Sequence, residues 1–181
     1  MKNKGFTLIE TLVSLLLFSI ISTISINVFI IAIKTQDRII TNQELVEKSA
    51  YALNYMNDKI RMAIKDEVGT CNGSVSNYGV GGDSISFLSF DPVNNRYICR
   101  EFLLEDNIIK LRISTDETSI SLGDAVPLTS SDVNVSNLRF SITGDDEVNQ
   151  PRVTTAMTMS KLNSSMELTV QTTVSQRQLN L

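Results

Sequence analysis

The chain has 181 residues with 16 basic and 20 acidic side chains, a formal net charge of −4. It contains no histidine, which excludes Ser-His-Asp and Cys-His catalysis and histidine-based zinc sites. It also has no phosphate-binding or dinucleotide-binding loop motif. The length predicts one globular domain plus a long helix, and the acidic balance argues against a strongly basic nucleic-acid-binding domain.

The amino-terminal segment combines a short basic leader with a long apolar run. Lys2 and Lys4 precede Gly5, and residues 6–33 then contain a single charged side chain. As a helix this run would be about 42 Å long, enough to cross the ~30 Å hydrocarbon core of a bilayer. The two lysines predict that the amino end stays in the cytoplasm. We therefore expect residues 6–33 to span a membrane and the rest of the chain to lie outside the cytoplasm.

Glu10 is the only charged residue of this run. A charge at the centre of a membrane helix costs on the order of 2.5–3.5 kcal/mol on insertion scales, so such charges are rare and usually functional. One interpretation lets the carboxylate reach the cytoplasmic interface, helped by the positive end of the helix dipole. The leader does not fit a secretory signal, which is cut after its apolar region, because its only small residue, Gly5, comes before that region.

The sequence GFTLIE (residues 5–10) resembles the class III leader of type IV pilins and type II secretion pseudopilins and matches that family's processing motif at every position. The resemblance implies that a membrane peptidase cuts between Gly5 and Phe6 and N-methylates the new amino terminus. It also implies that the Glu10 carboxylate pairs with the α-amino group of Phe6 on a neighbouring subunit, which would fix axial register. Cleavage would leave 14 of the 16 basic residues against 20 acidic ones, a balance of −6.

Small hydroxyl side chains form a stripe along the same helix at three- and four-residue spacing: Thr7, Thr11, Ser14, Ser22 and Ser25. Two interpretations stay open. Such residues let membrane helices approach closely and hydrogen-bond to one another. Alternatively, each hydroxyl donates to a carbonyl one turn earlier in its own helix.

Residues 34–67 are predicted to continue the helix as an amphipathic segment, because Lys34 to Asp66 contains no Pro or Gly. We expect one helix from Phe6 to Asp66, ended by Gly69. The predicted buried face comprises Ile39, Val46, Ala50, Leu53, Ile60 and Ile64. Tyr51 and Tyr55 are expected to pack together or against the sheet. Charged residues are predicted on the solvated opposite face: Glu44, Glu47, Lys48, Asp58, Lys59 and Arg61.

Residues 68–181 are predicted to form a β-rich head. Turn-rich segments separate runs typical of strands at residues 85–90, 96–104, 108–113, 133–142, 153–159 and 168–174. Glu105-Asp106-Asn107 predicts a tight hairpin. An antiparallel sheet needs a covered face, and the amphipathic half of the helix can cover it. The expected fold is therefore α+β, with a long helical stem packed on an antiparallel head, which is also the fold that the pilin resemblance implies.

Cys71 and Cys99 are the only cysteines. Outside the cytoplasm they could form a disulfide, and its loop of about 28 residues would stabilise the head by roughly 3–4 kcal/mol in the chain-entropy model. The alternative is two free thiols in a reducing habitat.

Asp145, Asp146 and Glu147 concentrate oxygen ligands in one segment and are weak calcium candidates. Their spacing does not match an EF-hand, so an acidic solvated loop is the favoured interpretation. Four basic residues, Arg96, Arg100, Lys110 and Arg112, could bind an anionic partner, but we interpret them as charges that protect an edge strand. We expect no cofactor and no enzyme activity.

The resemblance implies a minor filament subunit of a type IV pilus or type II secretion pseudopilus, acting in assembly or initiation at or near the tip. NRYICR (residues 95–100) and QPRV (residues 150–153) are similar to J-type pseudopilins and W-type pilins. The implied partners are a prepilin peptidase and N-methyltransferase, other pilins or pseudopilins, and an inner-membrane assembly platform. The alternative is a binding module, a pilus-displayed adhesin or DNA receptor. The chain would begin as a single-pass inner-membrane protein and move into a periplasmic or surface filament.

Overall fold

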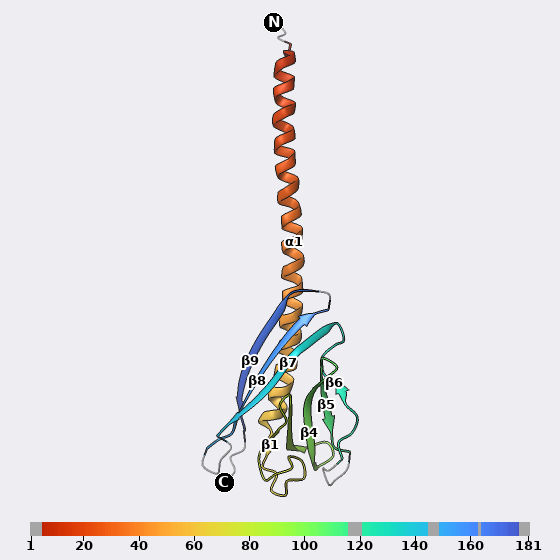
Figure 1. Cartoon of the computed structure of the whole chain (residues 1–181), viewed down its shortest axis with the longest axis vertical. Coiled ribbons are helices and arrows are strands. Elements are labelled where there is room, and N and C mark those ends of the chain that lie inside the picture. The colour runs from red at the N-terminus through yellow and green to blue at the C-terminus, as the bar shows by residue number, and fades with distance from the viewer. Residues whose placement is uncertain (1–4, 116–120, 145–148, 163, 178–181) are drawn as a thin grey trace. The chain divides into compact units, whose positions relative to one another are not determined.

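The computed structural model describes residues 5–115, 121–144, 149–162 and 164–177. The chain separates into two compact units, Met1–Thr41 and Asn42–Leu181. A single helix, α1 (Leu8–Arg61), contributes to both units, and strands β1 to β9 follow it (Figure 1).

Helix α1 contains 54 residues and no Pro or Gly, so neither helix breaker interrupts it. Lys59 and Arg61 lie in its last turn, where their positive charges interact favourably with the negative end of the helix dipole. The helix ends at Arg61, earlier than the predicted Asp66. Its last carbonyls find partners from the β region: the Tyr78 hydroxyl donates to the carbonyl of Ile60 (2.9 Å), and the N–H of Arg177 donates to that of Arg61 (2.8 Å).

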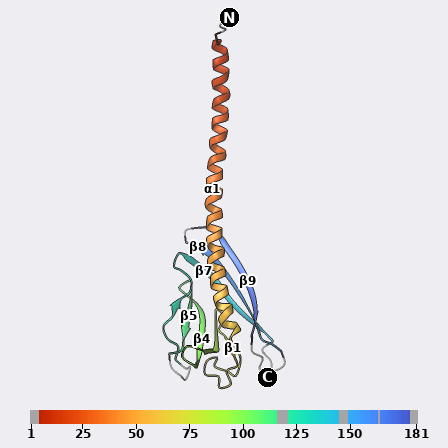
Figure 2. The ribbon, with the colours of Figure 1, turned by 180° about the vertical axis from the view of Figure 1, so that it is seen from behind.

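The strands form two antiparallel sheets rather than one. The first sheet contains β1 (Ala63–Ile64), β2 (Gly79–Val80), β3 (Ser84–Asp91), β4 (Arg96–Glu105), β5 (Ile108–Ile113) and β6 (Val126–Pro127), in the order β1-β3-β4-β5-β6 with β2 also paired to β3. The second sheet contains β7 (Val133–Thr143), β8 (Arg152–Lys161) and β9 (Glu167–Ser175), in that order. Both sheets pack against the carboxyl-terminal part of α1 (Figures 1 and 2).

The predicted hairpin between β4 and β5 is confirmed. Asp106 and Asn107 have positive φ angles of 54° and 61°, as both central residues of a type I′ turn require. Asn and Asp tolerate this conformation better than most residues. The turn sets the register in which Glu105 faces Ile108 and Phe102 faces Leu111.

The core lies between α1 and the two sheets, but the predicted helix face is only partly correct. Leu53 and Ile60 are buried as expected, whereas Ile39 and Val46 are 52% and 46% exposed, and Ile64 lies in β1. The buried stripe comprises Leu45, Ser49, Ala52, Leu53, Met56 and Ile60. Two neighbouring stripes of this helix are both apolar in sequence, and the sheets cover the one centred on Ala52 and Met56. The predicted contact between Tyr51 and Tyr55 is confirmed, with ring centroids 6.4 Å apart.

The charged residues of α1 are not all on a solvated face. Glu44 accepts a hydrogen bond from Lys161 of β8 (2.5 Å), and Lys48 forms an ion pair with Asp132. These pairs connect the helix to the start of β7 and the end of β8. The predicted α+β class is confirmed: a long apolar amino-terminal helix packs on antiparallel sheets in the carboxyl-terminal region.

We predict that Met56→Ala lowers the free energy of unfolding by about 2–5 kcal/mol, because Met56 is fully buried and its truncation leaves a cavity. Val46→Ala is the matched control on the neighbouring stripe, which is largely exposed, and we expect less than about 1 kcal/mol there. Chemical denaturation of the detergent-solubilised chain measures both. Equal losses in the two variants would contradict the observed burial.

Candidate functional site

The residues predicted for processing and register lie at the start of α1. Phe6 is 79% exposed. A Cβ added at Gly5 would meet no described atom within 4 Å. The bond between Gly5 and Phe6 is therefore uncovered by the part of the chain that the structure describes. Phe6 also lines an open, apolar depression of about 640 Å³ with Thr11, Ser14, Leu15 and Phe18.

Thr7 caps α1, a role not predicted above. The Glu10 N–H donates to the carbonyl of Thr7 (3.1 Å) and approaches its hydroxyl (3.4 Å). Thr followed three residues later by Glu is the capping-box pattern, in which the Glu side chain can reach back to the cap residue's N–H. The Thr7–Glu10 spacing in the sequence could have predicted this cap. The Thr7–Glu10 spacing therefore places Glu10 where a capping box uses its carboxylate, a local use to set beside the intersubunit pairing that the resemblance implies.

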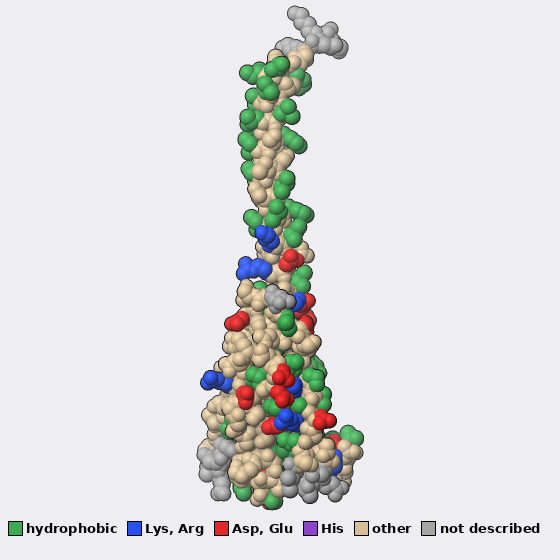
Figure 3. All heavy atoms as spheres, turned by 45° about the vertical axis from the view of Figure 1, so that its right-hand side comes forward, with side chains coloured by type: hydrophobic (Ala, Val, Ile, Leu, Met, Phe, Trp, Pro, Cys, Tyr) green, Lys and Arg blue, Asp and Glu red, His purple; other side chains and the backbone are tan. Residues whose placement is uncertain are grey.

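The apolar run has no covering within its own chain. Its large apolar side chains between Phe6 and Ile33 are 44–79% exposed. Figure 3 shows them covering the amino-terminal part of the helix, where charged side chains are sparse. In length and composition α1 suits a membrane span, with a mean hydropathy of 2.5 over its best 18-residue window, none of it buried. It is the one such helix among the described residues.

Three hydroxyls of the stripe donate hydrogen bonds within the helix. Ser14 donates to the carbonyl of Glu10 (2.7 Å) and Ser25 to that of Ile21 (2.9 Å). Thr11 donates to Leu8 (2.8 Å). These bonds match the intrahelical interpretation. They leave the small side chains on an exposed surface that another helix can approach.

A compact loop follows α1 and is organised by Asp66. This carboxylate is 1% exposed and accepts hydrogen bonds from the backbone N–H groups of Val68, Gly69, Cys71 and Asn72, at 2.7–3.3 Å. Burial on its own raises the pKa of Asp66. The backbone N–H groups of Cys71, Asn72, Gly69 and Thr70 outweigh it and hold the pKa below the usual value of 3.8.

Cys71 of this loop forms a disulfide with Cys99 of β4, with the Cα atoms 5.5 Å apart. Cys99 is buried, and its N–H donates to the Ser114 hydroxyl (3.0 Å). The disulfide therefore attaches the loop covalently to the first sheet, while Asp66 holds the loop together from within.

The four basic residues lie on interior strands β4 and β5, so the interpretation as edge charges is wrong. Lys110 contacts Glu105 and Asp106, each at 3.0 Å, and Arg112 contacts Glu101 at 3.4 Å. The hydrogen bonds that Lys110 donates to Asp106 and Glu105 raise the pKa of its ammonium group. Burial lowers the pKa of Arg100, whose guanidinium donates to the Ser89 hydroxyl. These contacts account for three of the four charges within the head and leave no cluster suited to an anion.

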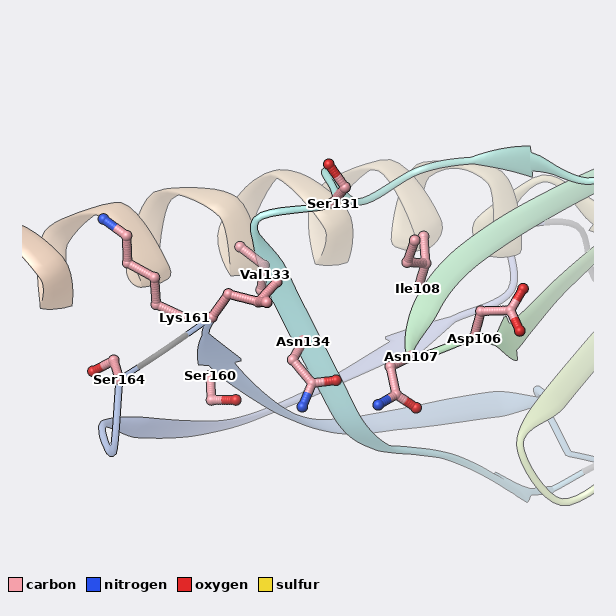
Figure 4. Close-up of a pocket in the computed structure, with 10 residues that line it drawn as sticks. Asp106, Asn107, Ile108, Ser131, Val133, Asn134, Ser160, Lys161 and Ser164 are labelled. Atoms are coloured by element: carbon pink, nitrogen blue, oxygen red, sulfur yellow. The ribbon is translucent and has the colours of Figure 1, made fainter.

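A polar groove of about 450 Å³ lies beside the β4–β5 turn (Figure 4). Its lining includes the side chains of Asn107, Asn134, Ser160 and Ser164. The N–H of Val135 donates to the carbonyl of Asn107 (2.9 Å) and holds the turn against β7. The charged residues of the groove are paired, Lys161 with Glu44 and Asp106 with Lys110. Its other polar groups are mainly amides and hydroxyls.

The weak calcium candidates Asp145, Asp146 and Glu147 lie outside the described residues. Within the described residues, no three Cys, Asp or Glu side chains are grouped in a way that could hold a metal ion.

Comparison with known proteins bears on the amino-terminal segment alone. Residues 1–26 match the family model described as the prokaryotic N-terminal methylation motif. The motif supports a type IV pilin-like protein. It implies processing by prepilin peptidase and assembly with other pilins, and it favours a structural subunit over an enzyme. With the exposed apolar helix, it is consistent with a membrane-anchored pilin. No curated protein and no solved structure matches the chain.

We predict that Asp66→Asn destabilises the chain by about 1–3 kcal/mol at neutral pH, because buried N–H groups lose a charged acceptor. A folded-state pKa below the unfolded value gives stability that is present above about pH 3.8 and is lost as the pH falls through the folded pKa. Unfolding measured between pH 7 and 3 should therefore show the two proteins converging in acid. Asp58→Asn, an exposed carboxylate of α1, is the control. A difference between wild type and Asp66→Asn that stays constant down to pH 3 would contradict this role.

Proposed function

We propose that this chain is a minor structural subunit of a type IV pilus or type II secretion pseudopilus, acting in filament assembly or initiation at or near the tip. The observation that carries the proposal is a methylation motif that leads directly into a helix with uncovered apolar side chains. The subunit is similar to J-type pseudopilins and W-type pilins in the short segments at residues 95–100 and 150–153.

In this proposal residues 1–5 are a leader and residues 6–33 cross the membrane before assembly. Residues 34–67 and the head, residues 68–181, lie outside the cytoplasm. The peptidase cuts between Gly5 and Phe6, and the exposed apolar side chains then leave lipid for contacts with neighbouring stems. Keeping apolar area away from water contributes roughly 25 cal/mol per Å². This free energy favours a direct transfer, in which the apolar run passes from lipid to neighbouring stems without contacting water.

Glu10 would set the register between stems. Within an apolar bundle a lone carboxylate is costly, and a cationic α-amino group of Phe6 on a neighbour would neutralise it. Only one axial offset brings the two groups together. Apolar packing alone is non-directional and would leave that offset undefined.

We predict that Glu10→Ala inserts and is processed but fails to enter filaments. Glu10→Gln separates the two roles of this residue, because Gln also serves at the third position of a capping box but carries no charge. If pairing matters, Gln fails as Ala does; if capping alone matters, Gln assembles normally. Ser14→Ala on the same helix is the control. Immunoblots of membrane and sheared-filament fractions measure the outcome, and normal incorporation of Glu10→Ala would reject the pairing.

We predict that a bulky residue at position 5, such as Gly5→Leu, leaves uncleaved precursor, because the peptidase must approach the backbone at this glycine closely. Gly5→Ala is the mild control and is expected to be processed. Mobility on a gel and amino-terminal sequencing distinguish precursor from mature chain. Complete processing of Gly5→Leu would contradict the cleavage site.

A second candidate function is display of an adhesive head, which the polar groove beside the β4–β5 turn favours. Its amides and hydroxyls, including Asn107, Asn134 and Ser160, suit a neutral, hydroxyl-rich ligand better than DNA. A clean gene deletion scored for surface pili, secretion, adhesion and DNA uptake separates the alternatives. Loss of adhesion with filaments intact would support the adhesin, and loss of filaments or of secretion would support the structural role.

A further inference from the structure

Strand β9 forms an open sheet edge. The second sheet has the order β7-β8-β9, so β9 pairs on one side only. The opposite edge is not free in the same way, because the Val135 N–H of β7 donates to Asn107 in the β4–β5 turn. The outer strands of the first sheet, β1, β2 and β6, have two residues each. Among the described strands, β9 is thus the long uncovered edge.

The register identifies the backbone groups that point outward. Gln176 donates its N–H to the carbonyl of Pro151 (3.0 Å) at the end of the β8–β9 ladder. In an antiparallel ladder, hydrogen-bonded and non-hydrogen-bonded pairs alternate. Val174, Thr172, Val170 and Leu168 therefore bond to β8. The N–H and C=O groups of Glu167, Thr169, Gln171, Thr173 and Ser175 point to the free side.

The features that usually protect an edge are missing from β9. Proteins block edges with short strands, prolines, lysines or bulges. β9 has nine residues, no proline and no basic residue, and its ladder with β8 is regular, whereas β7 contains a bulge at Val135/Asn137. Its single charge is Glu167 at the first position.

The side chains of β9 also leave apolar area to be covered. Leu168, Val170 and Val174 pack against the core but stay only partly buried. On the other face, hydroxyls pair across the sheet between Thr154 and Thr173 (2.9 Å) and between Thr158 and Thr169 (3.1 Å). A strand added beside β9 would complete the burial of the apolar side chains on the first face. It would also extend the line of paired hydroxyls on the other face.

We propose that β9 is an interaction edge that pairs with β9 of a second copy of this chain, joining two heads into one continuous sheet. Alternating donors and acceptors along an extended backbone are satisfied by another extended strand. Two copies of β9 can face one another because the residues after Glu167 are uncharged, so no row of like charges is opposed. The proposal goes beyond the proposed function, because a place at or near the filament tip does not by itself bring two copies of this chain together.

Cysteine cross-linking in membranes of cells expressing the full chain tests this edge. The two native cysteines are bonded to each other, so a cysteine introduced at Thr169, Gln171 or Thr173 is the single free thiol. We expect at least one of these variants to form a covalent homodimer on mild oxidation. Ala156→Cys is the matched control, since it faces Gln171 in register but lies on the central strand, and no dimer is expected there.

A second pair of variants separates edge pairing from contact between sheet faces. Lysines at Thr169 and Thr173 should reduce the Gln171→Cys dimer at least fivefold, whereas lysines at Thr154 and Thr158, on the same face of the central strand, should preserve it. No dimer from any of the three β9 cysteines, or a cross-link only to a different protein, would overturn the proposal. The assay is repeated in Glu10→Ala membranes. A dimer that persists there while filaments are lost shows that head pairing and stem register are separate properties.

Discussion

The apolar surface of α1 between Phe6 and Ile33 constrains everything else in this chain. Its side chains are 44–79% exposed within the protein, and exposing this area to water is unfavourable in proportion to its extent. Lipid can cover it before assembly, and equivalent helices of other subunits can cover it afterwards. The methylation motif at residues 1–26 implies processing by prepilin peptidase and assembly with other pilins, which is consistent with a helix that meets both environments.

The head follows a different physical rule, because its stability comes from specific polar contacts as well as burial. Where α1 ends, Tyr78 and Arg177 bond its last carbonyls. Immediately afterwards the Asp66 carboxylate accepts hydrogen bonds from backbone N–H groups of the loop, which have no partner in a helix or sheet. The disulfide from Cys71 then ties that loop to β4. The transition from helix to sheet is therefore closed by hydrogen bonds and one covalent link.

Sequence periodicity predicted the parts of the fold that repeat over many residues. The six longer strands and the β4–β5 hairpin follow from alternation and from two residues that tolerate positive φ. Strands β1, β2 and β6 have two residues each and carry no alternating pattern. The end of α1 and the burial of Met56 in place of Val46 depend on which sheet packs where. Such tertiary choices override local patterns.

The functional residues likewise divide into those that local sequence predicts and those that depend on the folded structure. Residues Gly5, Phe6 and Glu10 could be named from the sequence because the motif is contiguous. The capping role of Thr7 was also present as a local spacing. Asp66 could not be identified in this way, since its partners are backbone groups that converge only after the loop has folded.

The stem and the head would contribute differently to assembly: the stem would supply cohesion, and the head would supply direction. Apolar stem contacts supply cohesion but little direction, so a single carboxylate at Glu10 has to define the offset between neighbours. Edge contacts through β9 would be directional, because the outward N–H and C=O groups of Thr169, Gln171 and Thr173 can pair with another strand in only one register at a time. A subunit with both would discriminate among neighbours twice: first by charge position along the stem, and then by strand complementarity in the head. Such double selection suits a subunit that must occupy a defined place in a filament, since cohesion alone would admit any apolar stem.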